Sequence, residues 1–141
     1  MKKKIVFSKE QARMLYNLLS NHEVPNRSDN RKRFLFLKVI EAWVFEFDDL
    51  VDKIRSQKKK TIKELSDEIL EAGKETKAFI FKDREVFARV KDMFEKLYEV
   101  GTISRDERGA TKRGPLIGRD AKLYMELEDS FADVAEIKEK K

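Results

Sequence analysis

The residue types that most often carry catalysis are scarce in this chain of 141 residues. It contains no cysteine, so thiolate nucleophiles, thiolate metal ligands and disulfides are excluded. His22 is the one histidine, and it lies in a polar stretch beside Asn21 and Glu23. An imidazole suits general-base chemistry, but a catalytic triad would need a serine distant in the sequence. We therefore expect His22 to be a solvated loop residue.

Three carboxylates lie close together in one predicted helix, namely Asp48, Asp49 and Asp52. Such groups hold Mg²⁺ in nucleases and polymerases. Here no Asp-x-Asp motif, and no histidine or lysine of a nuclease signature, accompanies them. Their spacing favours a solvated helix face shared with Lys53 and Arg55. The sequence therefore predicts no metal site.

Residues 109–114 have the Gly-x4-Gly spacing that begins a phosphate-binding loop. In a true loop of this kind, Lys and Ser or Thr follow and hold the phosphates and Mg²⁺. Here Pro115 and Leu116 follow, and Pro115 lacks the backbone N–H that the loop would use. We therefore expect no nucleotide hydrolysis, no cofactor and no enzymatic activity.

The same glycine-rich segment is a candidate contact surface. Its glycines let the backbone approach a partner closely. Such a loop can follow phosphates as the wing of a winged-helix protein does, dock on an acidic protein surface, or be a soluble hairpin without a partner. The cations of residues 105–119 outnumber its two acids, Asp106 and Glu107; they are Arg105, Arg108, Lys112, Arg113 and Arg119.

A second basic cluster, with Arg31, Lys32 and Arg33, lies at the start of a long predicted helix. Cations at a helix N-terminus oppose the helix dipole, which hints that these side chains have a use. A third cluster, the lysines 58–60, precedes the next helix. No helix-turn-helix, zinc-finger or RNA-recognition motif accompanies these clusters. We predict partner contacts at the first two.

The pattern of apolar residues and caps predicts an α+β fold. Residues 4–7 form a strand that pairs with a strand at 77–82, and shorter strands are expected at 102–104 and 116–117. About five helices pack with this small antiparallel sheet of two to four short strands. Ser8 with Gln11, and Thr61 with Glu64, make capping boxes. Helices are predicted from Ser8 to about Leu19, from Ser28 or Asp29 to about Arg55, from Thr61 to Gly73, from Asp83 to Gly101, and from Asp120 to about Val134.

The long second helix is apolar over much of its circumference. Phe34 and Phe45 widen its apolar surface well beyond one stripe. Such a helix is either central in the fold or partly a partner surface. The predicted core stripe is Phe36, Ile40, Trp43, Phe47, Leu50 and Ile54.

Composition predicts one domain over residues 1–141, with a disordered basic tail from about residue 138. The apolar run 5–7 is too short for a signal peptide, and no run is long enough to cross a membrane, so we expect a cytoplasmic protein. Residues 1–60 carry 15 basic and 8 acidic side chains, whereas 61–141 carry 17 and 19. The chain has 16 glutamates and 21 lysines but two glutamines, which fits either a thermophilic source or a very soluble helical protein.

Three segments resemble small phage-encoded proteins: the lysine-rich strand before a capped helix, Arg31-Lys32-Arg33-Phe34 opening a long helix, and the closing helix at 123–131. With this composition, the chain is similar to the RNA-polymerase-binding transcription regulators of phages that infect thermophilic bacteria. The resemblance implies a protein that docks on host RNA polymerase, near the β-subunit flap and the sigma factor. Such docking inhibits host promoters or promotes antitermination. It assigns no residue roles.

The sequence therefore predicts a non-catalytic regulator of host RNA polymerase, monomeric when free, in the host cytoplasm if phage-encoded. Two alternatives stay open. One is a nucleic-acid-binding protein that uses residues 105–119 and 27–33 and whose affinity falls steeply with salt. The other is a virion structural or assembly protein that associates with itself through the second helix.

Overall fold

The computed structural model describes residues 2–21, 24, 26–100 and 102–137 of the chain. Within these residues the fold is α+β, as predicted, with five α-helices and two antiparallel sheets. One sheet has the strand order β2-β1-β5, with β1 at Lys2–Ser8, β2 at Thr76–Phe81 and β5 at Ala135–Ile137. The other is a hairpin of β3 (Thr102–Arg105) and β4 (Thr111–Gly114). The helices are α1 (Lys9–Ser20), α2 (Arg27–Arg55), α3 (Ile62–Ala72), α4 (Arg84–Glu95) and α5 (Gly118–Ala132), with a 3-10 turn η1 at Tyr98–Val100.

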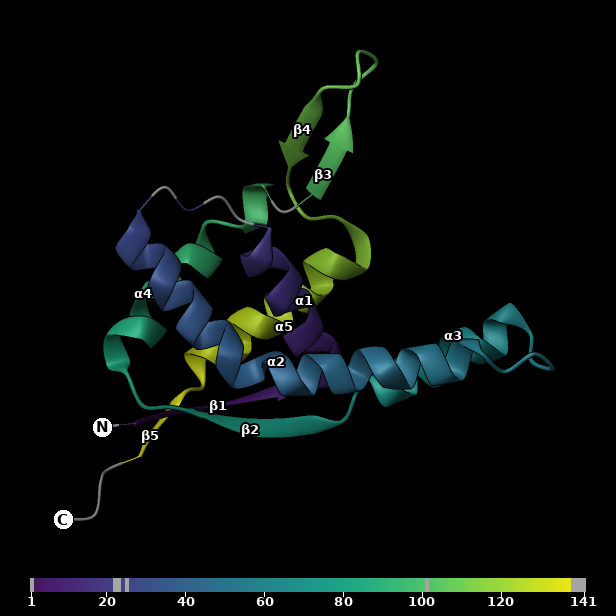
Figure 1. Cartoon of the computed structure of the whole chain (residues 1–141), viewed down its shortest axis with the longest axis horizontal. Coiled ribbons are helices and arrows are strands. Elements are labelled where there is room, and N and C mark those ends of the chain that lie inside the picture. The colour runs from purple at the N-terminus through teal and green to yellow at the C-terminus, as the bar shows by residue number, and fades with distance from the viewer. Residues whose placement is uncertain (1, 22–23, 25, 101, 138–141) are drawn as a thin grey trace.

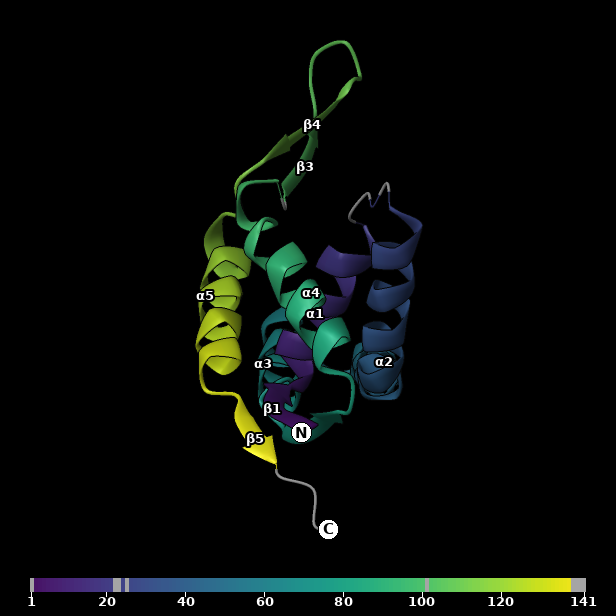
Figure 2. The ribbon, with the colours of Figure 1, turned by 90° about the vertical axis from the view of Figure 1, so that its left-hand side faces the viewer.

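The elements form a helical body on one face of the three-stranded sheet, with two projections. Helices α1, α4, α5 and the first half of α2 stand on the sheet, which lies at the bottom of both views (Figures 1 and 2). The hairpin β3–β4 projects from the opposite end of the body. The last part of α2 and α3 extend together to one side (Figure 1), and we call this pair of segments the arm.

Alternation along β1 and β2 explains why the sheet covers the helices. Ile5 and Phe7 point inward and are buried, while Val6 between them is exposed. On β2, Phe79 and Phe81 are likewise buried, while Ile80 between them is exposed. Ile5 pairs with Phe79. A period of two therefore gives the sheet one apolar face for the helices to cover. The predicted pairing of residues 4–7 with the strand at 77–82 is confirmed.

Aromatic rings fill the space between the sheet and the helices. Phe36 of α2 stacks on Phe81 with ring centroids 4.4 Å apart, and Phe94 of α4 stacks on Tyr124 of α5 at the same distance. The Tyr124 hydroxyl donates to the Phe94 carbonyl at 2.7 Å, and burial raises the pKa of Tyr124 to about 12. The buried core thus joins α2, α4 and α5 to the sheet.

Helix α2 is buried along one side and exposed on another, so its interpretation as a central helix is confirmed, while a partner surface on its exposed side stays a prediction. The predicted stripe is buried at Phe36, Ile40, Trp43, Phe47 and Ile54, while Leu50 is half-buried. Outside that stripe Leu37 and Val44 are also buried, whereas Phe34 is 56 % exposed and Phe45 is 46 % exposed.

A lysine is buried where α1 begins. Lys9 is 3 % exposed, and its Nζ lies 3.0 Å from Glu75 Oε2 and 3.4 Å from Glu46 Oε1. The ammonium also lies 4.8 Å from the centroid of the Trp43 ring. Burial by itself lowers the pKa of Lys9, but the two carboxylates more than offset this, so the pKa is raised. The ammonium is therefore charged, which suits a structural role rather than a nucleophile.

Several predicted boundaries were wrong. The cap of α2 is Asn26, whose side chain accepts from the N–H groups of Ser28 and Asp29, so neither of those residues is the cap. The cap position of α5 is Ile117, which makes no side-chain capping bond, and Asp120 lies in the first turn. Asn26 is the cap because its side-chain oxygen accepts hydrogen bonds from two free N–H groups of the first turn.

Other differences concern the ends of elements. Helix α4 ends at Glu95, and the chain tightens into η1 before residue 101, which lies outside the described residues, as does the tail from 138. The return strand of the hairpin is 111–114, not 116–117, because Leu116 is buried in the body. Helix α5 ends at Ala132, so Val134 precedes β5, a strand that was not predicted. None of the helices described is long and apolar enough to cross a membrane.

Candidate docking surface at the hairpin end

The β3–β4 hairpin has a turn held by its own side chain. The Asp106 carboxylate accepts from the N–H groups of Arg108 and Ala110, both at 2.9 Å. The Gly109 N–H donates to the Asp106 carbonyl at 3.0 Å, and Gly109 has a φ of +79°, which favours glycine. Asp106 therefore stabilises the turn, and its carboxylate faces backbone N–H groups.

Three predicted contact residues lie on this hairpin with their side chains exposed. Arg105, Arg108 and Lys112, which we call the hairpin cations, make no ion pair within the part of the chain that the structure describes. Glu107 is the second acid of the segment and is exposed as well. The hairpin thus carries three exposed cations and one exposed acid away from the body (Figure 1).

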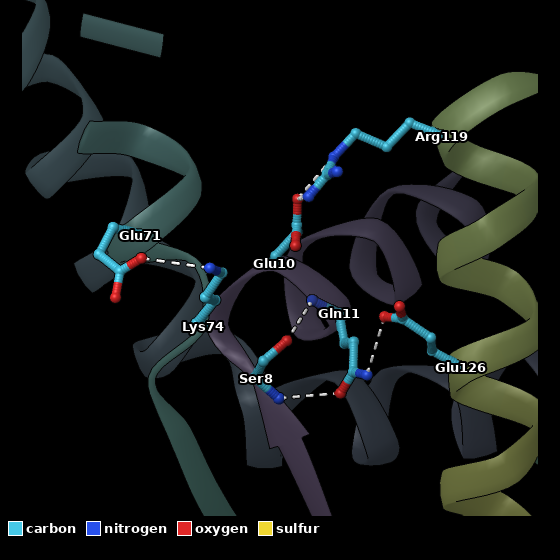
Figure 3. A network of polar contacts seen from close by, with 7 residues as sticks. All are labelled: Ser8, Glu10, Gln11, Glu71, Lys74, Arg119 and Glu126. Atoms are coloured by element: carbon cyan, nitrogen blue, oxygen red, sulfur yellow. Dashed lines mark hydrogen bonds and ion pairs between the residues drawn. The ribbon is translucent and has the colours of Figure 1, made fainter. Parts of the chain in front are cut away.

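Arg113 and Arg119 differ from the hairpin cations because each is bound to another element. Arg113 Nη2 donates to the Asn21 carbonyl at 3.3 Å, which attaches β4 to the end of α1. Arg119 donates through Nε to Glu10 Oε1 at 2.8 Å, which attaches α5 to the start of α1 (Figure 3). Arg119 therefore joins two helices and is not part of the hairpin.

The second predicted cluster lies at the first turns of α2. Arg31 is exposed and has no ion-pair partner among the residues described. Lys32 is half-buried. Arg33 is half-buried too, and its Nη1 donates to the Leu19 carbonyl at 2.9 Å while Nη2 contacts Asn30 Oδ1.

The two clusters meet at the C-terminal end of α1. Arg33 binds the carbonyl of Leu19, and Arg113 binds the carbonyl of Asn21. The last carbonyls of a helix have no partner within it and carry partial negative charge, so they attract guanidinium groups. The hairpin and the start of α2 consequently lie at the same end of the molecule in both views (Figures 1 and 2). The third cluster, at 58–60, lies at the tip of the arm, where Lys60 pairs with Glu68.

Asp29 holds the start of α2 in place. Its two carboxylate oxygens accept from Arg89 Nε at 2.8 Å and Nη2 at 2.7 Å, which ties α2 to α4. This hydrogen bonding lowers the pKa of Asp29 from its ordinary value of 3.8. Partial burial by itself would raise the pKa, but its effect is smaller. The second basic cluster is therefore fixed in position by an acid-sensitive contact.

We expect Asp29→Asn to destabilise the protein at neutral pH and to flatten its acid unfolding. A carboxyl with a lowered folded pKa contributes stability above its ordinary pKa and loses it as the pH falls through the folded value. The wild-type and variant unfolding curves should therefore differ at pH 7 and converge once the pH falls below the lowered folded pKa of Asp29. Urea unfolding across this range measures the difference. Asp49→Asn, an exposed aspartate of the same helix, is the matched control, and an equal loss in both variants would contradict the assignment.

A groove at the base of the hairpin was not predicted. It has a volume of about 390 Å³ and lies where α1, α2, α3, η1, β4 and α5 converge. Apolar side chains line much of it, and Arg13, Arg113 and Arg119 also line it. We call it the hairpin-base groove. Its apolar lining includes Met14, Leu18, Phe47, Ile69, Leu70, Leu97, Val100, Leu116 and Leu123.

Two of the segments considered for catalysis, residues 48–52 and 109–114, lie among the described residues. Asp48 pairs with Arg13 of α1 at 2.8 Å, whereas Asp49 and Asp52 are exposed. Among the residues described, no three His, Asp or Glu side chains gather as metal ligands would. Residues 109–114 form the turn and return strand of the hairpin, not a phosphate loop. His22 lies outside the described residues.

Comparison of the chain with models of known protein families, with curated protein sequences and with solved structures gave no match.

Proposed function

We propose that the protein is a non-catalytic regulator that docks on host RNA polymerase through its hairpin end and thereby modulates transcription. The observation that carries the docking role is the projecting hairpin with Arg105, Arg108 and Lys112, which make no ion pair with any residue that the structure describes. The resemblance to phage transcription regulators supports RNA polymerase, at its β flap or sigma factor, as the partner. The regulator acts in the host cytoplasm and is a monomer when free.

The geometry of the hairpin suits docking for two reasons. Its turn is fixed by Asp106 and Gly109, so binding orders little backbone and loses little conformational entropy. Its arginines suit an acidic protein surface, because guanidinium groups make paired hydrogen bonds to carboxylates. Arginine is also enriched among the residues that dominate binding at protein interfaces.

Direct binding of nucleic acid is the second candidate, and the meeting of the two basic clusters at one end favours it. Arg31 and the hairpin cations would then contact phosphates at two places along a backbone. This function requires an affinity that falls steeply as salt rises, since every neutralised phosphate releases counterions. A protein partner held by apolar contacts as well gives a shallower dependence.

Capture of partners from host lysate tests the proposed function. The tagged full chain is incubated with nuclease-treated lysate, and the retained proteins are identified and quantified by mass spectrometry. We expect RNA polymerase subunits in amounts comparable to the bait. Retention of polymerase only when nuclease is omitted would favour the nucleic-acid function, and absence of polymerase under both conditions would contradict the proposal.

A further inference from the structure

Helix α2 has an apolar strip that the rest of the protein leaves uncovered. Phe34 and Phe45 are exposed, as are Leu35 at 45 % and Val39 at 39 %. At about 100° per residue, these side chains and the exposed Ala42 fall on one face of the helix. Helix α2 crosses the front of the molecule in Figure 1 and forms its right-hand edge in Figure 2. Apolar side chains gathered in this way mark an interaction surface, which we call the α2 face.

The α2 face has a recess along one border. A hollow of about 360 Å³ lies beside Leu35 and Val39, and Ile80 of β2 lines it too. On the opposite border, the Phe45 ring packs edge-on against Tyr16 of α1, with the ring centroids 5.9 Å apart. This contact holds the ring in place while leaving part of it in solvent. A partner therefore meets a preformed apolar surface and has few side chains to order.

The charges along this part of α2 change sign once. Between residues 31 and 49, every basic side chain precedes every acidic one. This order separates the opposite charges, so few of them stabilise the helix as i,i+4 pairs. The basic residues are Arg31, Lys32, Arg33 and Lys38, and the acidic residues are Glu41, Glu46, Asp48 and Asp49.

Ion pairs within the protein reduce this polarity but leave it in place. In the acidic half, Arg13 pairs with Asp48 and Lys9 lies 3.4 Å from Glu46. Asp49 is exposed and makes no ion pair with any residue that the structure describes. The acidic half therefore keeps a carboxylate available to a partner.

The basic half keeps its charges available as well. Arg31 and Lys38 are exposed, and neither makes an ion pair within the described part of the chain. A second copy turned end to end would place its acidic half against this basic half, whereas a parallel copy would set like charges against each other. The α2 face is thus complementary to itself in the antiparallel orientation alone.

We propose that the α2 face binds the α2 face of a second copy of this chain, with the two helices antiparallel about a two-fold axis near residue 40. Arg31 and Asp49 lie equally far from this point along the helix, so each Arg31 faces Asp49 of the other copy. Phe34 and Phe45 are nearly matched in the same way, so their rings approach across the axis. Such an interface is isologous and closes at a dimer.

The arm gives this arrangement room. The last part of α2 extends beyond the body (Figure 1), so the arm of each copy lies along the body of the other. At the ends of the contact, Arg27 faces Asp52 and Lys53, whose charges offset each other. The inference goes beyond the proposed function and does not depend on it. The monomer of that proposal is the dilute form of the chain, and the dimer forms as its concentration rises.

Sedimentation velocity of the full chain tests the inference, at concentrations from about 2 to 300 μM in low salt. We expect a reversible equilibrium between monomer and dimer, with no larger species. A single monomeric species across this range would overturn the inference, as would growth into larger oligomers. A chain that stays monomeric but captures polymerase from lysate would overturn this inference alone and leave the proposed function standing.

A charge exchange tests the antiparallel orientation. Arg31→Glu and Asp49→Arg should each raise the dissociation constant of the dimer at least about tenfold, because each creates like-charge contacts twice in the dimer. The double variant R31E/D49R exchanges the two charges and should return to within about threefold of the wild type. Lys59→Glu, an exposed lysine at the arm tip, makes the same change of charge as Arg31→Glu and should have less than about a twofold effect. A double variant that dissociates as readily as the single variants, each folded by circular dichroism, would overturn the orientation.

Cross-linking locates the interface, because the chain has no cysteine of its own. In the Ala42→Cys variant, a short bismaleimide should join two copies at concentrations where the dimer forms. Met125→Cys is the control, since it lies exposed on α5, on the other side of the molecule from α2 (Figure 2). We expect cross-linked dimer from the first variant and little from the second. Equal yields from the two variants, or a higher yield from Met125→Cys, would place the contact away from the α2 face.

Discussion

Replacement of Trp43 by alanine is expected to lower the free energy of unfolding by about 3–5 kcal/mol. Trp43 is 7 % exposed and contacts both Phe79 of the sheet and the buried Lys9 ammonium. Its ring packs edge-on against Phe79 at a centroid distance of 6.4 Å. Alanine leaves a cavity at this position and removes the aromatic face near the Lys9 and Lys77 ammonium groups.

Urea unfolding followed by circular dichroism measures this loss, with two companion variants. Trp43→Phe should lose much less, because it keeps an aromatic ring and removes an indole N–H that is buried without a partner in the described structure. Phe45→Ala, on the exposed side of the same helix, should cost about 1 kcal/mol or less. A Trp43→Ala variant that is fully stable but no longer binds the partner would place Trp43 in an interface and contradict its role in the core.

The parts of the fold that were predicted depend on neighbouring residues in the sequence. Ser8 caps α1 together with Gln11, and Asp83 caps α4, because a cap bonds N–H groups two or three positions away. The period of two in β1 and the helical stripe of α2 are equally local patterns. Such signals can be recognised without knowledge of the tertiary structure.

The parts that were missed depend on distant residues or on competing local signals. Strand β5 has three residues, and its place in the sheet follows from pairing with β1 at the other end of the chain. At the start of α2, Asn26, Ser28 and Asp29 are all suitable caps, and their residue types alone do not rank them. Asp120 looked like the cap of α5, but the helix begins two residues earlier at Gly118.

The same difference between local signals and contacts of distant residues applies to the candidate site. The basic character of the hairpin and of the first turns of α2 was predicted, because composition reveals it directly. The bonds of Arg33 and Arg113 to the end of α1 were not predicted, since they join residues 14 and 92 positions apart. The hairpin-base groove was missed for this reason too, because six elements from different parts of the chain form it.

Reversal of the hairpin cations is expected to weaken partner binding at least about tenfold while leaving the fold intact. The triple variant R105E/R108E/K112E replaces three exposed cations that have no ion-pair partner in the described structure. Each new carboxylate repels an acidic partner surface, so the effect exceeds the loss of attraction alone. Arg113 and Arg119 are left unchanged because their bonds to Asn21 and Glu10 hold β4 and α5 against α1.

A charge-matched control is available at the tip of the arm. The variant K58E/K59E/K63E changes the net charge by the same amount, and its three lysines are also exposed and without ion-pair partners among the residues described. It lies far from the hairpin end (Figure 1). Because net charge and general repulsion change equally in the two variants, a difference between them reports the position of the contact.

The most direct test of the docking surface is therefore the affinity of these two variants for the captured partner, measured side by side with the wild type by biolayer interferometry. Thermal unfolding of each variant first establishes that its fold is retained. The account predicts that the hairpin variant loses at least about tenfold in affinity while the arm variant stays within about twofold of the wild type. Equal affinities for the two variants, or a larger loss in the arm variant, would contradict docking through the hairpin end.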